Sequence, residues 1–447
     1  MRENTLNMTQ GNPTRLLISF SIPMLIGNLF QQAYNLVDSV IVGKYVGADA
    51  FGAIGATSSV SFLFFALCNG ISSGGGIIAS QYYGAAEKDK VKRAMANAAY
   101  ISIIISLLVG TIAYITSGAV LRLLRTPDEL MQDALIYMHM QCIGVPLIAV
   151  YNYASAMLRA LGDSKGPLYF LIFACALNIG LDLLFVRGLN LSVFGAGLAT
   201  IIAQFIAGFG CLIYAFKTNT YFRMERKNLR MDKTMIWKTV SLGVPLSIQY
   251  SLIAISCMGL QVVVNSFGPI AVAAFTATSR IEQILHQPYN SLGTALSTYS
   301  GQNKGAKLND RILLGFRKSL VMMGVFSIIM LPIMQFFGEN IVRMFVEETE
   351  VIQMGAKALR ITSWFYFTLG LIYITRGVLN GVGDAIFALI NGIVEVVCRM
   401  ILPVILTMIP LIGVWGIWYA SGIIWAISAL FCMLRYFWWK KSVIKIA

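Results

Sequence analysis

The stretches MLRALGD, residues 157–163, and VLNGVGD, residues 378–384, are two versions of one motif, and together they decide the fold. Asp384 follows Asp163 by 221 positions, and four further pairs keep that spacing: Gln81 and Gln302, Gly84-Ala85 and Gly305-Ala306, Arg122 and Arg343, and Gly195 and Gly416. A spacing that is kept over most of a chain of 447 residues indicates that its two halves are repeats of one structural unit.

The composition is that of a membrane protein. Hydrophobic residues make up 57% of the chain and charged residues only 12%, whereas roughly 25% charged residues is usual in a soluble domain. The seven cysteines stand singly in apolar runs and only two histidines occur, so neither a disulfide framework nor a structural metal site is expected. The first apolar run, residues 16–42, is too long for the core of a signal peptide and is expected to remain as a spanning helix.

Apolar runs long enough to cross a bilayer, roughly 20 residues, recur twelve times. Their approximate limits are 16–42, 52–80, 94–118, 135–158, 168–186, 194–216, 236–264, 270–298, 312–336, 355–376, 386–408 and 413–436. Helices are expected because an open sheet cannot satisfy its backbone groups in lipid. The sequence therefore predicts an all-α polytopic membrane protein with 12 transmembrane helices in two six-helix lobes and an internal pseudo-two-fold repeat. The expected limits are 1–216 for the first lobe, 217–235 for a basic cytoplasmic linker and 236–447 for the second lobe.

The distribution of Lys and Arg predicts the orientation. Most of them lie in connections on one side of the membrane. These connections include residues 88–93, residues 217–238, the connection between the tenth and eleventh spans, in which we place Arg376, and the C-terminal tail. Because cytoplasmic loops carry the excess of basic residues, both termini are expected in the cytoplasm. The net charge of +14 is then an orientation signal spread over many loops, and no nucleic-acid partner is expected.

Two carboxylates lie inside predicted spans of the first lobe. Asp38 lies near the outer end of the first span, Asp182 near that of the fifth, and Thr200 near the outer start of the sixth, so the three share one depth. Asn178 is one turn below Asp182, and Tyr34 is one turn below Asp38. Ionisable groups are costly in lipid and usually mark a function or an ion pair. Carboxylate, amide and hydroxyl oxygens suit Na⁺, and two carboxylates in a low dielectric readily share a proton, so a cation site is expected.

A structural role is the alternative, in which neighbouring backbone donors satisfy each carboxylate and the two acids lock helices together. The repeat argues against it, because the second-lobe positions that match Asn178 and Asp182 are Arg399 and Pro403. An acid pair that occurs in one lobe only is expected of a function rather than of the fold.

The second lobe has buried charges of its own. Glu395 and Arg399 are four residues apart on the eleventh span, where an intrahelical ion pair is favoured over a gating or substrate role. Arg280 and Glu282 on the eighth span are interpreted similarly. In the first lobe, Pro23 lies well inside the first span, where it removes a helix hydrogen bond and permits a bend.

The sequence resembles the MATE family, the multidrug and toxic compound extrusion transporters. The resemblance covers essentially the whole chain and rests on the twelve spans, the opening SIPMLIGNLFQQAYNLVDSVIVG at residues 21–43 and the paired RALGD and NGVGD turns. It is closer to the bacterial DinF-like and MepA-like branches than to the NorM branch. The resemblance implies a bend at Pro23 and a first-lobe site for Na⁺ or H⁺ at Asp38, Asn178, Asp182 and Thr200, with further polar positions at Tyr34 and Asn152.

One feature departs from the NorM branch. Members of that branch carry a Glu in the seventh span, whereas residues 246–262 of this chain, LSIQYSLIAISCMGLQV, contain no acid. The tenth span likewise has none before Asp384. We therefore expect coupling to run through the first lobe.

The resemblance implies a secondary active efflux transporter that exports amphipathic, often cationic compounds in exchange for H⁺ or Na⁺ by alternating access. It implies no catalytic residue, no cofactor besides the coupling ion, and a monomer embedded in the lipid bilayer of a bacterial inner or plasma membrane. An exporter or flippase of one metabolite or of a lipid-linked saccharide, from the same superfamily, is the alternative. A membrane-embedded enzyme is disfavoured because the spans show no His cluster or Ser-His arrangement, and a channel because they show no rings of pore-lining charge.

Overall fold

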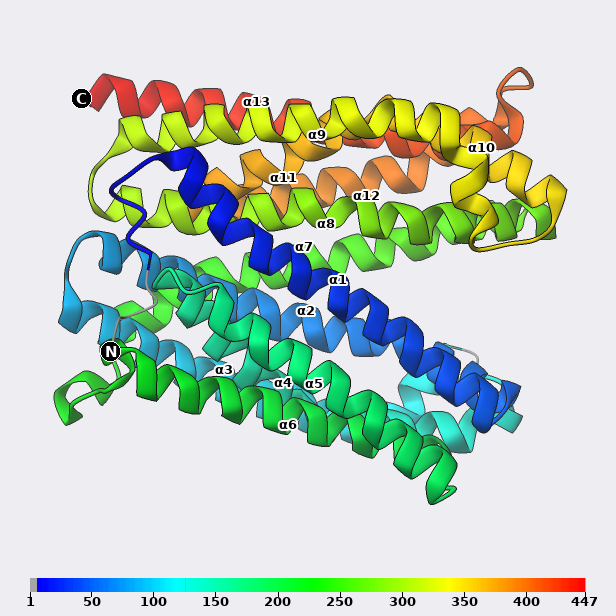
Figure 1. Cartoon of the computed structure of the whole chain (residues 1–447), viewed down its shortest axis with the longest axis horizontal. Coiled ribbons are helices and arrows are strands. Elements are labelled where there is room, and N and C mark those ends of the chain that lie inside the picture. Colours follow the sequence, from blue (N-terminus) through cyan, green and yellow to red (C-terminus); the bar gives the residue numbers. More distant parts are fainter. Residues whose placement is uncertain (1–5, 125, 447) are drawn as a thin grey trace. The chain divides into compact units, whose positions relative to one another are not determined.

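The computed structural model describes residues 6–124 and 126–446, apart from the side chains of residues 35–36, 39, 48–49, 51, 59, 254, 258 and 444–446. Within these residues the regular structure is entirely helical and contains no strand (Figure 1). Ten of the helical segments are long and apolar enough to cross a membrane. The all-α membrane fold that the sequence predicts is confirmed.

The six predicted spans of the first half each correspond to a helix. Their bounds are α1 Pro13–Tyr45, α2 Ala48–Gly84, α3 Lys88–Leu123, α4 Asp128–Ala160, α5 Lys165–Asp182 and α6 Ser192–Thr218. A π-helix, η1 (Leu183–Gly188), continues α5 directly. The linker holds two short 3₁₀ turns, η2 (Thr220–Phe222) and η3 (Arg226–Leu229).

The second half follows the same order with one difference. Its helices are α7 Lys233–Asn265, α8 Pro269–Gly305, α9 Asn309–Arg343, α10 Thr349–Ser363, α11 Tyr366–Gly381, α12 Ala385–Met408 and α13 Gly416–Ile446, with a 3₁₀ turn η4 at Gly413–Trp415. The tenth predicted span, residues 355–376, is thus broken into two helices, α10 and α11.

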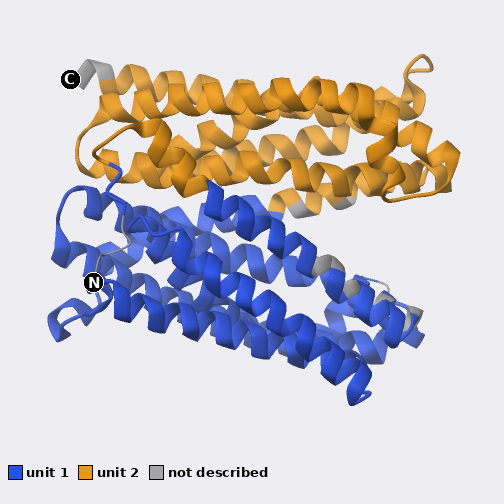
Figure 2. Ribbon diagram, viewed as in Figure 1, with its two compact units in different colours: residues 1–8, 22–251 blue, residues 9–21, 252–447 orange. Residues whose placement is uncertain are grey.

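The chain divides into two compact units (Figure 2). Unit 1 comprises Met1–Met8 and Ile22–Ser251, and unit 2 comprises Thr9–Ser21 and Leu252–Ala447. Both α1 and α7 therefore contribute residues to each unit. The lobe limits of 1–216 and 236–447 stay a prediction.

The predicted repeat is visible in the turns that carry the opening motif. Gly162 and Gly383 have φ values of 92° and 93°, a backbone conformation that only glycine adopts without strain. In both turns the amide of the next residue donates to the carbonyl five positions earlier: Asp163 to Leu158 at 2.9 Å and Asp384 to Leu379 at 2.8 Å. This is the Schellman pattern of a helix C-terminus, and it ends α4 in the first repeat and α11 in the second in the same way.

The glycine-rich segment of residues 70–76 in α2 is a helix-packing surface. A Cβ on Gly74 would lie 2.5 Å from the Gly243 amide nitrogen of α7, and one on Gly76 would lie 3.2 Å from the Ala156 carbonyl oxygen of α4. Small residues let helix backbones approach closely where lipid offers no hydrophobic driving force for association.

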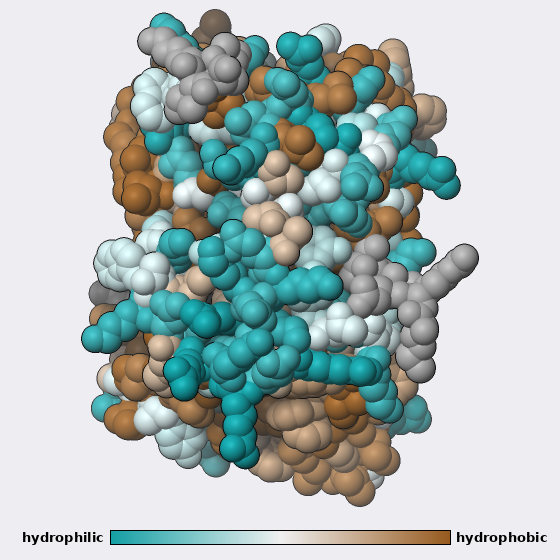
Figure 3. Space-filling model, turned by 90° about the vertical axis from the view of Figure 1, so that its left-hand side faces the viewer, coloured by the Kyte–Doolittle hydropathy of each residue, from teal (hydrophilic) through white to brown (hydrophobic). Residues whose placement is uncertain are grey.

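Each unit is apolar along its helices and hydrophilic at an end. Ile115 of α3 and Ile328 of α9, which are equivalent helices of the two repeats, are 75% and 73% exposed. Hydrophilic side chains gather instead at one end of each unit, which in unit 1 is the end that carries the α2–α3 connection and in unit 2 the end that carries the α8–α9 connection (Figures 1 and 3). We assign the apolar sides to contact with lipid tails.

Replacing Gly383 by Ala tests the repeated turn. The substitution places a Cβ on a residue with a φ of 93°, and a left-handed conformation costs an L-residue about 1–2 kcal/mol. We expect a lower midpoint of thermal unfolding in detergent micelles. The matched control is Gly55→Ala in α2, where a Cβ would meet no atom within 4 Å. Equal midpoints for the two variants would contradict the assigned role of the turn.

Candidate functional site

The candidate site lies in unit 1, where the side chains of Asp38 on α1 and Asp182 on α5 meet. The two carboxyl groups form a hydrogen bond with each other, and the residues are 8% and 0% exposed. A carboxylate can only accept a hydrogen bond, so a bond between two carboxyl groups requires a proton on one of them. Two neighbouring carboxyl groups in a low dielectric are disfavoured as a doubly charged pair, so one proton or one bound cation would stabilise them.

An apolar cluster positions the elements that carry the pair. Three of its buried members each lie about one turn from a polar residue of the site: Ile41 after Asp38, Val186 after Asp182 and Ala196 before Thr200. The cluster thereby packs α1, η1 and α6 together beside the two acids. In lipid the hydrophobic effect does not drive helices together. These contacts therefore stabilise the arrangement mainly by van der Waals packing.

The backbone changes from an α-helix to a π-helix immediately after Asp182. The helix α5 ends at this residue, and η1 begins at Leu183. A π turn holds an extra residue and occurs frequently at functional sites. Asp182 and Val186 both remain buried across the change, whereas Leu184 between them is 51% exposed.

Tyr34 and Thr200 join the site through a hydrogen bond between their hydroxyl groups. Both carboxyl groups also act electrostatically on Tyr34. Thr200 Oγ1 donates to the Ala196 carbonyl oxygen at 3.1 Å, which ties the hydroxyl to its own helix. The structure therefore brings α1, α5 and α6 together at one polar position.

The two asparagines differ in their placement. Asn178 is 1% exposed and lies one turn before Asp182 on α5. Asn152 is buried on α4 and its Nδ2 has no hydrogen-bond partner. Among the described residues no hydrogen bond joins Asn152 to the carboxyl pair.

Tyr137 is a member of the site that the sequence analysis missed. It lies on α4, is 7% exposed, and both Asp38 and Asp182 act electrostatically on it. Its hydroxyl forms a hydrogen bond with Gln141. The signal in the sequence was the spacing of four residues between Tyr137 and Gln141, which places two polar groups on one face near the start of the fourth span.

One oxygen of the acid pair indicates a ligand. Asp38 Oδ1 is buried and accepts no hydrogen bond among the described residues. Leaving a buried acceptor without a partner costs about 1–3 kcal/mol, so such an atom needs an explanation. Carboxylate, amide and hydroxyl oxygens are the ligands that hard cations prefer. The residues present therefore fit a proton or Na⁺.

The structure corrects the partner expected for Glu395 in unit 2. The predicted intrahelical pair with Arg399 does not form. Instead, Arg376 Nη2 lies 2.5 Å from Glu395 Oε1, and Ser428 Oγ donates to the same oxygen at 2.8 Å. The assignment of Arg376 to a connection was also wrong, because this residue lies inside α11, where its long side chain reaches the neighbouring α12.

The other second-lobe charges are separate from one another. Arg399 Nη1 donates to Ser256 Oγ at 3.0 Å. Arg280 is exposed and Glu282 is half-buried, and within the described part of the chain no ion pair joins them. All these residues belong to unit 2, whereas the acid pair belongs to unit 1.

Pro23 lies inside α1, which continues without a break from Pro13 to Tyr45. The residue is buried. The helix therefore accommodates the missing amide donor, and the bend at Pro23 stays a prediction.

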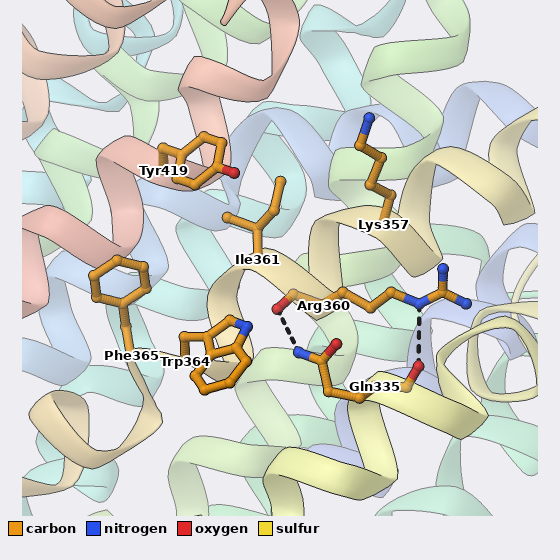
Figure 4. Close-up of a pocket in the computed structure, with 7 residues that line it drawn as sticks. All are labelled: Gln335, Lys357, Arg360, Ile361, Trp364, Phe365 and Tyr419. Atoms are coloured by element: carbon orange, nitrogen blue, oxygen red, sulfur yellow. Dashed lines mark hydrogen bonds between the residues drawn. The ribbon is translucent and has the colours of Figure 1, made fainter.

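A separate hollow of about 340 Å³ lies in unit 2 at the break between α10 and α11 (Figure 4). Gln335 of α9 and Arg360 of α10 cross-link its floor, because Arg360 Nε donates to the Gln335 carbonyl oxygen at 3.1 Å and Gln335 Nε2 donates to the Arg360 carbonyl oxygen at 2.9 Å. The remaining lining residues are Lys357, Ile361, Trp364, Phe365 and Tyr419.

The fold and its buried polar residues define the class: a multi-pass helical membrane protein built from two repeated units. A sequence model of the MatE family matches residues 23–184 and 245–405, and the chain belongs to this family of membrane transporters. The predicted MATE resemblance is thereby confirmed.

Known relatives agree with this assignment. The chain is 30% identical over 396 residues to the probable multidrug resistance protein YpnP of Bacillus subtilis, which covers 87% of each sequence. It is 23% identical over 443 residues to the multidrug export protein MepA of Staphylococcus aureus, which covers 97% of this chain and 96% of the relative. A crystal structure of a MATE in complex with MaL6 has the same fold, with a TM-score of 0.93 at 20% identity over the whole of both chains.

Replacing Glu395 by Gln tests the buried ion pair. The variant leaves the Arg376 guanidinium buried without its counter-ion, and removing one partner of a buried pair typically costs about 3–5 kcal/mol. We expect a large loss of thermal stability in detergent micelles. Glu339→Gln is the matched control, because Glu339 pairs with Arg360 at 3.3 Å on the exposed surface, where such a pair contributes about 0–1 kcal/mol. A loss no larger than that of the control would argue against the pair.

Proposed function

We propose that this chain is a secondary active multidrug efflux transporter of the bacterial plasma membrane. It exports amphipathic, often cationic compounds in exchange for H⁺ or Na⁺, which binds at Asp38 and Asp182 of unit 1. The observation that carries the proposal is the buried, hydrogen-bonded carboxyl pair with an unpartnered oxygen on Asp38. Membership of the MatE family and the names of the bacterial relatives support the multidrug class.

The chemistry of the pair supplies a force that depends on the cation. A bound proton or Na⁺ offsets the repulsion between the two carboxylates, and its release leaves two like charges close together. Two unit charges 4 Å apart interact with about 4 kcal/mol at an effective dielectric constant of 20. This approaches the roughly 5.5 kcal/mol that moves a two-state equilibrium from 1:99 to 99:1. Cation binding at one pair can therefore bias the whole transporter.

The helices that carry the acids determine what moves. Release of the cation separates Asp38 on α1 from Asp182 on α5, and the hydrogen bond between Tyr34 and Thr200 passes the strain to α6. Pro23, which lacks an amide donor, is the position at which α1 yields most easily. In the proposed cycle the outward-facing state binds the cation and releases drug, and the inward-facing state loads drug. Different cation affinities of the two states drive the exchange.

Efflux from proteoliposomes tests the coupling site. A fluorescent amphipathic cation is loaded, and proton and Na⁺ gradients are imposed separately. We expect Asp38→Asn and Asp182→Asn to lower gradient-driven transport by ~10-fold or more, because a coupling energy of 1.4 kcal/mol already corresponds to a factor of ten. Asp310→Asn, an exposed residue at the start of α9, is the matched control and is expected to transport normally.

The outcomes of this experiment separate the parts of the proposal. Normal transport by correctly folded Asp38→Asn and Asp182→Asn proteins would refute coupling through unit 1. If neither the proton gradient nor the Na⁺ gradient moves any amphiphile, the multidrug assignment is refuted and an exporter or flippase of one metabolite or lipid-linked saccharide is favoured.

The proposed orientation places both termini in the cytoplasm, because basic connections are retained on that side. A reporter that is active only in the cytoplasm is fused after the C-terminus, and in a second protein it is inserted at Leu411, a 96% exposed residue between α12 and α13. We expect activity from the first fusion and none from the second. The reverse result would overturn the orientation.

A further inference from the structure

The hollow at the break between α10 and α11 carries two cations beside a surface that is otherwise apolar. Lys357 is exposed and Arg360 is half-buried, and both line the hollow together with Trp364 and Tyr419, which are 66% and 41% exposed (Figure 4). The next residue of α9 after the hollow's Gln335 is a phenylalanine that is 79% exposed. A charged side chain next to hydrocarbon is costly and usually marks a function or an ion pair. The two cations therefore need an explanation.

The first repeat shows that the fold does not require these cations. The spacing of 221 residues between the repeats is the same before and after α10, so it matches Lys357 with Ile136 and Arg360 with His139. The equivalent surface of α4 thus has an apolar side chain and a histidine where α10 has a lysine and an arginine. Two cations that occur in one repeat only are expected of a function rather than of the fold.

The contacts of these helices agree with the alignment of the repeats. In unit 1 the ring of His139 stacks on the ring of Tyr114 of α3, with the two centroids 4.2 Å apart. In unit 2 the residue equivalent to Tyr114 is Gln335 of α9, which is hydrogen-bonded to Arg360. The same positions of equivalent helices therefore meet in both units, and only the chemistry of their side chains differs.

The protein itself offsets only one of the two charges. Arg360 Nη2 lies 3.3 Å from Glu339 Oε1 at the surface. Lys357 Nζ lies 4.0 Å from the centroid of the Trp415 ring, and within the described part of the chain it forms no ion pair. Glu350 precedes Lys357 by seven residues, or about two turns of α10. No acid lines the hollow itself, so its positive charge is available to an anion.

The surroundings of the hollow suit the anionic head of a lipid. Tyr419 lies in the first turn of α13, and Tyr and Trp side chains such as Tyr419 and Trp364 are enriched at the level of lipid headgroups. Ile328 and Val321 precede Gln335 by seven and fourteen residues, so they share its face of α9. They are 73% and 62% exposed. An apolar strip therefore leads from the hollow along α9, where acyl chains can lie.

We propose that this hollow binds the phosphate group of an anionic phospholipid, and that the lipid's acyl chains lie along α9. The Lys357 ammonium and the Arg360 guanidinium bind the phosphate oxygens through charge-assisted hydrogen bonds, and the Tyr419 hydroxyl supplies a further donor. A lipid in this position contacts α9, α10 and α13 and stabilises unit 2. The inference goes beyond the proposed transport function and uses the proposed orientation only to name the leaflet, which is the one that faces away from the cytoplasm.

Native mass spectrometry of the detergent-purified protein tests the inference by counting bound lipid. The protein is titrated with dioleoylphosphatidylglycerol and, separately, with dioleoylphosphatidylcholine, whose choline group cancels the charge of the phosphate. We expect the parent to bind one phosphatidylglycerol more tightly than phosphatidylcholine. Lys357→Gln is expected to bind phosphatidylglycerol about five-fold more weakly, because one basic residue near a lipid surface contributes roughly 1 kcal/mol. Because Lys357 is exposed, its replacement is expected to leave the fold intact.

The matched control is Arg122→Gln, which removes one positive charge from an exposed residue in the last turn of α3. It is expected to bind phosphatidylglycerol as the parent does. Arg360→Gln is a second variant of the hollow, and it is expected to bind the lipid more weakly than the parent.

Three results would overturn the proposal. Equal affinities of the parent and Lys357→Gln for phosphatidylglycerol would remove the site from the hollow. Equal affinities of the parent for the two lipids would show that only the acyl chains bind. The third arm measures the midpoint of thermal unfolding, which we expect phosphatidylglycerol to raise and inorganic phosphate to leave unchanged; an equal rise with inorganic phosphate would make the occupant a free anion. None of these measurements involves transport, so their failure is distinguishable from a failure of the proposed function.

Discussion

Hydrocarbon offers no hydrogen-bond partner, so every polar group within the membrane must be satisfied by the protein itself. This constraint explains the helices, and it also explains how buried side chains are arranged. Glu395 forms an ion pair with Arg376 and accepts a hydrogen bond from Ser428, and Asp38 and Asp182 interact with each other. Against this background, the buried Asp38 Oδ1 is informative, because an acceptor without a partner beside a second carboxyl group indicates a place where a ligand can bind.

Much of the fold could be predicted because its signals are local or periodic. The spacing of 221 residues between Asp163 and Asp384 identified the repeat, and both motifs form the same glycine-containing turn. The lengths of the apolar runs located the helices. The shared depth of Asp38 and Asp182 likewise followed from their distance to the helix ends. Each of these features depends only on counting residues along the chain.

Features that depend on contacts between helices could not be predicted in this way. The sequence shows that Arg399 is one turn from Glu395, but not that Arg376 from a neighbouring helix reaches the carboxylate first. Tyr137 was missed because its role arises only when α4 packs beside α1 and α5. Two irregularities of the helices, the π-helix after Asp182 and the break after Ser363, have no proline or glycine at the point where the helix changes. The local sequence therefore did not predict them.

The break in the tenth predicted span has a consequence for biosynthesis. The helices α10 and α11 have 15 and 16 residues, so each is about 22–24 Å long at 1.5 Å per residue, which is shorter than the hydrocarbon core of about 30 Å. The polar α8 is not among the helices apolar enough to span alone. These three segments therefore cannot enter the bilayer one at a time as they leave the ribosome. They must wait for α9, α12 and α13, which makes the integration of unit 2 a late and cooperative step.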